Sequence, residues 1–152
     1  MSPRKREQEN ADQNAETWVL GWLARREHSV REARQRLTRK GVSESRITEV
    51  MDKLIAEGAI SDRRFAESLV RVRAARGKGP LLVGAELRSR GIERELAREI
   101  TDTYAWHDVG KIAKAKRFGE GLPADSDEFD RQARFLAGRG FPIDMIFSLL
   151  GR

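Results

Sequence analysis

The sequence predicts an all-α protein of three tandem three-helix repeats that stack into an elongated, curved array. The first observation behind this prediction is a phrase that occurs three times, at Leu37 to Val42, Leu87 to Ile92 and Leu136 to Phe141. Each copy has a leucine, a cation three residues later, a glycine and an apolar residue, which is typical of a helix that ends on a left-handed glycine. The second observation is that apolar residues recur at helical rather than strand spacing after about residue 15. A signal that returns about every 50 residues indicates one repeated structural unit, and such arrays offer extended surfaces more readily than enclosed pockets.

The repeats are expected over residues 15–60, 61–106 and 107–152. Residues 1–14 are polar throughout, and we expect them to form a disordered tail.

In the first repeat, Trp18 and Trp22 lie four residues apart on one helical face, so we expect both to be structural. Residues 29–32 form a capping box that opens a second helix. Ser43 is expected to cap a third helix, which Gly58 closes.

In the second repeat, Ser61 is expected to cap the first helix. The Gly77 to Gly79 segment breaks that helix, and Pro80 starts the next helix at a first helical position. The third repeat is expected to contain one helix before a loop at residues 119–125 and two helices after it.

The composition limits the class of protein. The 152 residues are 36% charged and 39% hydrophobic, which leaves thin cores and argues against a large enzyme. There is no cysteine, so disulfides and thiolate metal sites are excluded. No apolar stretch is long enough for a signal peptide or for a membrane span of ~20 residues. We therefore expect a cytoplasmic monomer that has no membrane contact, cofactor or metal ion.

The net charge of +6 is concentrated in residues 63–90, where eight basic residues stand against two acidic ones. Such a patch is expected of a protein that meets a polyanion or an acidic partner, although a solvated face is the alternative for any single arginine. The candidate residues for binding a partner or DNA lie in this region and in the second helix of the first repeat: Arg36, Arg39, Lys40, Arg64, Arg71, Arg73, Arg76, Lys78, Arg88 and Arg90. Arg64 and Arg71 lie seven residues apart, so we expect them on one helical face turned away from the core.

The sequence does not predict catalysis. His28 and His107 are the only histidines, and neither has a second metal ligand at helical spacing. The acidic run at residues 125–130 lacks the glycine and glutamate of a calcium loop, and the Gly77 to Gly79 segment lacks the frame of a phosphate-binding loop. The third helices of the first two repeats each carry a net charge of −2, which disfavours reading of a DNA major groove.

Several motifs span nearly the whole chain in a fixed order. They are Ser29-Val-Arg-Glu32 and Leu37 to Gly41; Asp62-Arg-Arg-Phe65-Ala66 with Arg71, Arg76 and Gly77; Gly79-Pro80-x-x-Val83-x-x-Glu86-Leu87-x-x-Arg90-Gly91-Ile92; and Phe135-Leu136-x-x-Arg139-Gly140-Phe141. From about Trp18 to Leu150, the sequence resembles the RecX family of bacterial recombinase regulators. It departs from that family at Ala33, where the family more often has a larger apolar residue.

The resemblance implies three tandem three-helix units and a non-catalytic function. That function is to bind the RecA recombinase filament on DNA and to restrain its assembly and ATP hydrolysis. The alternative is a helical repeat protein that binds single- or double-stranded nucleic acid through backbone phosphates, without regard to sequence.

Overall fold

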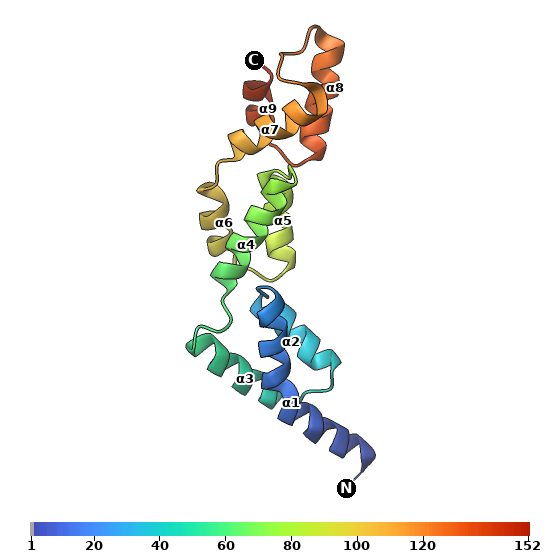
Figure 1. Cartoon of the computed structure of the whole chain (residues 1–152), viewed down its shortest axis with the longest axis vertical. Coiled ribbons are helices and arrows are strands. Elements are labelled where there is room, and N and C mark those ends of the chain that lie inside the picture. The colour runs from blue at the N-terminus through green and yellow to red at the C-terminus, as the bar shows by residue number, and fades with distance from the viewer. Residues whose placement is uncertain (1) are drawn as a thin grey trace. The chain divides into compact units, whose positions relative to one another are not determined.

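The computed structural model describes residues 2–152, which form nine α-helices and no strand (Figure 1). The helices are α1 (Pro3–Arg25), α2 (Val30–Arg39), α3 (Glu44–Ala56), α4 (Asp62–Ala75), α5 (Pro80–Ser89), α6 (Arg94–Asp102), α7 (Trp106–Phe118), α8 (Ser126–Gly138) and α9 (Ile143–Leu149). The prediction of an all-helical chain of tandem three-helix groups is confirmed. Among these nine helices, none is both long and apolar enough to cross a membrane. Within residues 2–152, no three His, Asp or Glu side chains gather as a metal site would require.

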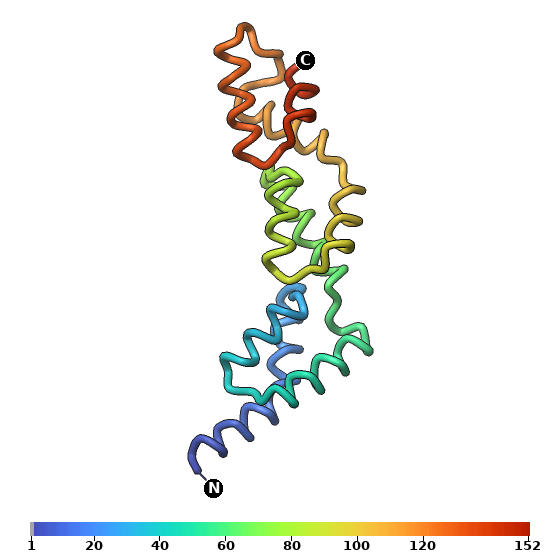
Figure 2. The backbone as a smooth tube through the Cα atoms, turned by 180° about the vertical axis from the view of Figure 1, so that it is seen from behind, coloured from blue at the N-terminus to red at the C-terminus, as the bar shows by residue number. Residues whose placement is uncertain are grey.

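The chain divides into two compact units. Unit 1 runs up to Ala66 and includes Arg90–Ile92, and unit 2 consists of Glu67–Ser89 and Glu93–Arg152. In unit 1, α1 and α2 both pack against α3. In unit 2, α5 packs against α6, while α7, α8 and α9 all contact one another, as the backbone tube shows (Figure 2).

The repeated phrase ends α2, α5 and α8 as the sequence predicts. The φ angles after these helices are +87° at Gly41, +85° at Gly91 and +95° at Gly140. Residues with a Cβ rarely adopt this conformation, which explains the glycine in each copy. The amide of Val42 donates to the carbonyl of Leu37 at 3.1 Å, and Phe141 and Leu136 form the same bond at 3.1 Å. All four of these apolar side chains are buried, so each turn also packs back on its helix.

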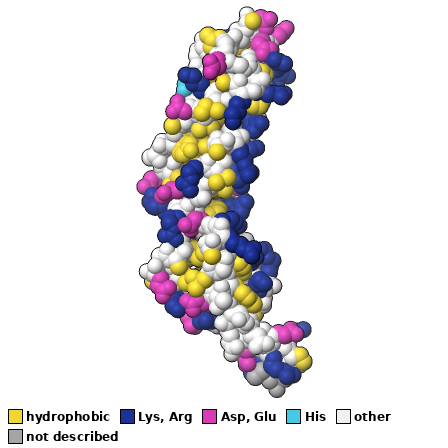
Figure 3. All heavy atoms as spheres, in the orientation of Figure 1, with side chains coloured by type: hydrophobic (Ala, Val, Ile, Leu, Met, Phe, Trp, Pro, Cys, Tyr) yellow, Lys and Arg dark blue, Asp and Glu magenta, His cyan; other side chains and the backbone are white. Residues whose placement is uncertain are grey.

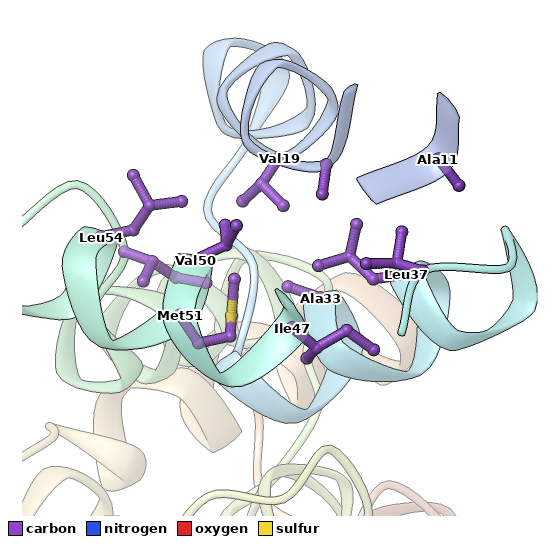
Figure 4. Close-up of a cluster of buried hydrophobic side chains, with 11 residues drawn as sticks. Ala11, Val19, Ala33, Leu37, Ile47, Val50, Met51 and Leu54 are labelled. Carbon is purple, nitrogen blue, oxygen red and sulfur yellow. The ribbon is translucent and has the colours of Figure 1, made fainter. Parts of the chain in front are cut away.

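The core of unit 1 lies between α1, α2 and α3 (Figure 4). Val19 of α1 and Leu37 of α2 are fully buried in it. The third helix contributes four side chains at helical spacing: Ile47, Val50, Met51 and Leu54. Ala15 and Ala33 are also fully buried, and their small side chains let the helices approach closely.

α1 begins at Pro3, so the prediction of a disordered tail was wrong for residues 3–14; Met1 lies outside the described residues. Ser2 caps the helix by accepting a hydrogen bond from the amide of Lys5. Pro3 suits the first turn, because an amide at that position has no partner within a helix. Ala11 is buried in the unit 1 core, which gives this polar segment an apolar contact.

Asp12 fixes α1 to the start of α3. Its carboxylate accepts hydrogen bonds from the amide and the hydroxyl of Ser43, each at 2.8 Å, and its carbonyl accepts one from Arg46 at 2.9 Å. One turn later, Glu16 pairs with Lys53 at 2.6 Å. Polar residues that have no local partner in the sequence are therefore ordered by α3.

In unit 1, the turn that follows α5 packs against the start of α2. The hydroxyl of Ser29 donates to the carbonyl of Arg90 at 2.8 Å, and it also accepts from the amide of Glu32 at 3.1 Å as the cap of α2. A Cβ on Gly91 would lie 2.7 Å from the Cβ of Arg31, so this approach requires glycine.

In unit 2, the turn that follows α8 packs against the start of α5 in the equivalent way. The amide of Gly79 donates to the carbonyl of Arg139 at 2.7 Å, and the amide of Leu81 donates to the carbonyl of Gly140 at 2.9 Å. A Cβ on Gly79 would lie 2.6 Å from the carbonyl carbon and oxygen of Gly140. We call this contact the unit 2 joint.

Replacing Asp12 with alanine should lower the free energy of unfolding by about 1.5–3 kcal/mol, because Ser43 loses a charged acceptor. Urea denaturation followed by circular dichroism measures this change. The matched control is Glu9→Ala at an exposed position of the same helix, which should change the free energy by less than about 0.5 kcal/mol. Equally small effects of both substitutions would show that Asp12 does not fix α1.

Replacing Gly79 with alanine should destabilise the chain by about 1–3 kcal/mol, because the added Cβ collides with the backbone of Gly140. Gly138→Ala is the control: a Cβ there meets nothing within 4 Å, and alanine favours the helix. Thermal unfolding should show a lowered midpoint for the first variant and an unchanged or raised midpoint for the second. A tolerated alanine at position 79 would contradict the close contact in the unit 2 joint.

Candidate partner-binding surface

Arg64 holds the chain that follows α3. Its Nε pairs with a carboxylate oxygen of Glu27 at 2.9 Å, and its Nη2 donates to the carbonyls of Gly58 at 2.8 Å and Ala59 at 3.1 Å. These carbonyls lie in the turn after α3, where a helix leaves backbone acceptors unsatisfied. The guanidinium of Arg64 is therefore committed to unit 1.

Arg73 ties α4 to α5. Its Nε and one Nη donate to the two carboxylate oxygens of Glu86, each at 2.8 Å, in a half-buried bidentate pair. These hydrogen bonds hold the pKa of the Arg73 guanidinium above its usual value. The pair neutralises both partners and leaves neither charge for another molecule.

The cations of the first repeat cover two tryptophans. The guanidinium carbon of Arg36 lies 4.2 Å from the ring centroid of Trp22, and the ammonium of Lys40 lies 4.7 Å from that of Trp18. Both tryptophans are half-buried and pack against the unit 1 core, so their predicted structural role is confirmed. Such cation–π contacts leave the positive charge uncancelled while shielding the rings from water.

Unit 2 contains a groove of about 1000 Å³ that is lined by the end of α4, the turn before α5, α7 and the end of α8. Seven cations line this unit 2 groove: Arg71, Arg76, Lys78, Lys116, Arg117, Arg134 and Arg139. Among the described residues, no aspartate or glutamate lines it. Every charged side chain of the lining is therefore positive.

Helical spacing places these side chains on the groove. Arg71 precedes Ala74 and Ala75 by three and four residues, so all three share one face of α4. Arg134 and Gly138 share one face of α8 for the same reason. Ala74, Ala75 and Gly138 are small, so they leave the floor of the groove open between the long cationic side chains.

Two groove arginines are held without any carboxylate. The guanidinium of Arg139 donates to the carbonyl of Arg76 at 3.2 Å, and its Cζ lies 5.1 Å from the ring centroid of Phe135. The Cζ of Arg117 lies 5.9 Å from the same ring, and Phe118 meets that ring edge-on at 5.3 Å. Backbone and aromatic contacts position these charges and leave them uncancelled.

The distribution of charge in unit 2 is visible on the face drawn in Figure 3. Basic side chains lie beside hydrophobic ones along α5 and α8, whereas acidic side chains gather where α8 begins. The acidic residues of that region are Asp125, Asp127, Glu128 and Asp130. Asp125 caps α8 by accepting from the amide of Glu128 at 2.8 Å, so the acidic run serves a helix start.

The structure brings together only three of the ten cations proposed from the sequence: Arg71, Arg76 and Lys78 line the unit 2 groove. The others lie elsewhere: Arg64, Arg73 and Arg90 form ion pairs, Arg36 and Lys40 cover tryptophans, and Arg39 and Arg88 are exposed on α2 and α5. The Arg90 pair, with Glu32 at 3.0 Å, belongs to unit 1.

Four groove cations were missed because they belong to the third repeat: Lys116, Arg117, Arg134 and Arg139. Summed along the sequence, their charge is offset by the acidic run at residues 125–130. These cations could have been found by asking which residues share one face of a helix, rather than by summing charge along the sequence. In α7, Val109, Ala113 and Lys116 recur at four- and three-residue spacing and share one face.

Replacing Arg73 with methionine should lower the free energy of unfolding by about 1–3 kcal/mol, because Glu86 loses both of its hydrogen bonds from Arg73 in a half-buried site. Arg71→Met, two residues earlier at an exposed position, should cost less than about 0.5 kcal/mol. Urea denaturation compares the two variants. If Arg71→Met lowered the free energy of unfolding more than Arg73→Met, then Arg71 rather than Arg73 would be the structural cation.

Comparison with known proteins agrees with this architecture. Models of the first and second three-helix domains of RecX match residues 16–54 and 61–99, respectively. The regulatory protein RecX of Halorhodospira halophila is 40% identical over 130 residues, which cover 84% of this chain and 81% of that protein. The regulatory protein RecX of Chromohalobacter salexigens is 41% identical over 126 residues, which cover 82% of each chain.

A solved structure shares the fold. The crystal structure of RecX from Lactobacillus salivarius superposes with a TM-score of 0.79 at 21% identity, over 93% of this chain and 96% of that one. The helix order, the two matched domains and the similarity to these relatives together show that the chain belongs to the RecX family of regulatory proteins.

Proposed function

We propose that this chain regulates the RecA recombinase by binding the RecA filament on DNA and restraining filament assembly and ATP hydrolysis. Membership of a family of regulatory proteins supports the regulatory role. The observation that carries the binding step is the unit 2 groove, where seven cations gather without a carboxylate. A surface of this kind attracts an anionic partner and accelerates its association.

Binding alone is enough for regulation. A protein that performs no chemistry shifts an equilibrium when it binds one state of its partner more tightly than another. A regulator that binds RecA in a state that cannot add subunits or hydrolyse ATP would restrain both processes together. The basic groove would supply affinity for that state.

The proposal is tested by measuring RecA ATP hydrolysis on single-stranded DNA in the presence of the purified chain. The reversal Arg71→Glu with Arg134→Glu removes two groove cations that make no ion pair within residues 2–152. We expect this double variant to need at least about tenfold more protein for equal inhibition. Arg64 is unsuitable for this test, because its reversal would also break the contacts that follow α3.

The matched control reverses Arg98 and Lys111, two exposed cations of unit 2 outside the groove, for the same change in net charge. This control should inhibit as the unaltered chain does. Equal loss in both double variants would assign the effect to overall charge rather than to the groove. No effect of the unaltered chain on RecA would contradict the proposed function.

The second candidate function is nucleic-acid binding without regard to sequence, and the same uncancelled cations favour it. Fluorescence anisotropy with a labelled oligo(dT) strand over a range of salt concentrations tests it. If the groove binds phosphates, the salt slope of the Arg71→Glu with Arg134→Glu variant should flatten by about 0.7 for each phosphate that it no longer neutralises. Relief of RecA inhibition by excess DNA would favour this candidate over a direct protein contact.

A further inference from the structure

The apolar floor of the unit 2 groove is mainly aliphatic, with Tyr104 and Phe135 as its two aromatic residues. Ile112 of α7 lines it with 59% of its surface exposed, although large apolar side chains are usually buried. Val109 and Ala113 stand beside it on the same face of α7, and Ala74 and Ala75 line the groove from α4. An exposed apolar floor inside a concave surface favours an occupant that removes it from water.

The rim of the groove is made mainly of arginine. Five of its seven cations are arginines, and an arginine fork matches the two oxygens of a carboxylate. Contacts of Arg139 with the Arg76 carbonyl and the Phe135 ring hold that side chain in place before any partner arrives. Less side-chain freedom is then lost on binding.

These features fit a nucleic-acid strand less well. Single strands bind proteins by stacking their bases on aromatic faces as well as by phosphate contacts. In this groove the ring of Phe135 already has Arg139, Arg117 and Phe118 packed around it. Tyr104, the other aromatic residue of the lining, is 36% exposed, and its ring centroid lies 4.9 Å from that of Trp106. The more exposed Ile112 is aliphatic, so the groove presents no row of open aromatic faces for successive bases.

We propose that the unit 2 groove docks an acidic segment of a protein partner that carries apolar side chains on one face. The apolar face covers Ile112 and Ala75, while carboxylates on both flanks meet the cations of the rim. This is the way in which amphipathic helices occupy grooves, with anchors three and four residues apart. The inference rests on the proposed function only in requiring a protein partner.

The test uses the full chain and a designed peptide, followed by fluorescence anisotropy at physiological salt. The probe is a fluorescein-labelled peptide of about 15 residues, with leucines at i, i+3, i+4 and i+7 and glutamates on both flanks. A scrambled peptide of the same composition keeps the charge but loses the apolar face. The amphipathic peptide should bind at least about tenfold more tightly than the scrambled one, and equal affinities would overturn the proposal.

Two charge-neutral variants separate the floor from general charge. Ile112→Ser should weaken binding of the amphipathic peptide about tenfold or more. Ile143→Ser, on an isoleucine of α9 that is 64% exposed and lies outside the groove, is the matched control and should leave affinity unchanged. Equal effects of both variants would overturn the proposal. Circular dichroism checks that both variants fold, and Arg134→Glu gives a second groove variant that should also weaken the peptide.

Labelled oligo(dT), used in the same anisotropy measurement, tests whether the groove binds a nucleic-acid strand instead of a peptide. If the strand binds more tightly than the peptide and loses affinity with Arg134→Glu but not with Ile112→Ser, the groove is a phosphate site and the proposal is overturned. RecA is absent from this experiment. A chain that binds the peptide through the groove but has no effect on RecA would therefore refute the proposed function alone.

Discussion

The rest of unit 2 depends on one close backbone contact, in which the turn after α8 meets the start of α5. Gly79 donates its own amide to the carbonyl of Arg139 at 2.7 Å, and no Cβ fits at that distance from Gly140. The equivalent contact within unit 1 uses the Ser29 hydroxyl as donor to Arg90. Ser29 reaches Arg90 with its side chain, whereas the backbone of Gly79 approaches Gly140 so closely that no Cβ fits, and this explains why the two equivalent positions differ in sequence.

The unit 2 joint also assembles the groove. It places the end of α8 beside the turn that follows α4, where Arg139 donates to the carbonyl of Arg76 at 3.2 Å. Cations from the second and third repeats then line the same surface, although like charges repel one another. The attraction that holds them together is supplied by backbone hydrogen bonds and buried apolar side chains such as Leu136 and Phe141, which do not depend on the charge of the rim.

The sequence predicted the features that depend on neighbouring residues and missed those that depend on residues far apart in the chain. Helix ends at Gly41, Gly91 and Gly140 were predictable, because a glycine cap depends on residues of its own turn. The hydrogen bonds from Val42 to Leu37 and from Phe141 to Leu136 span only five residues. The helical state of residues 3–14 was not predictable, because the partners of Asp12 lie 31 and 34 residues away at the start of α3. The same limit applies to Arg64, whose partner Glu27 is 37 residues distant. Only three of ten proposed cations reach the groove, because a linear sum of charge does not report which helix faces meet.

Ion pairs elsewhere in unit 2 help to keep the groove uniformly positive. Glu86 is the only carboxylate of α5, and Arg73 binds both of its oxygens away from the groove. The repulsion among the groove cations remains uncompensated, and at physiological salt it is screened only beyond about 8 Å. An anionic occupant would relieve this repulsion, so binding and folding of unit 2 are thermodynamically linked. Repulsion among these cations destabilises the unbound chain, and binding of an anionic partner removes that repulsion. The groove is therefore better suited to association than to stabilising the fold.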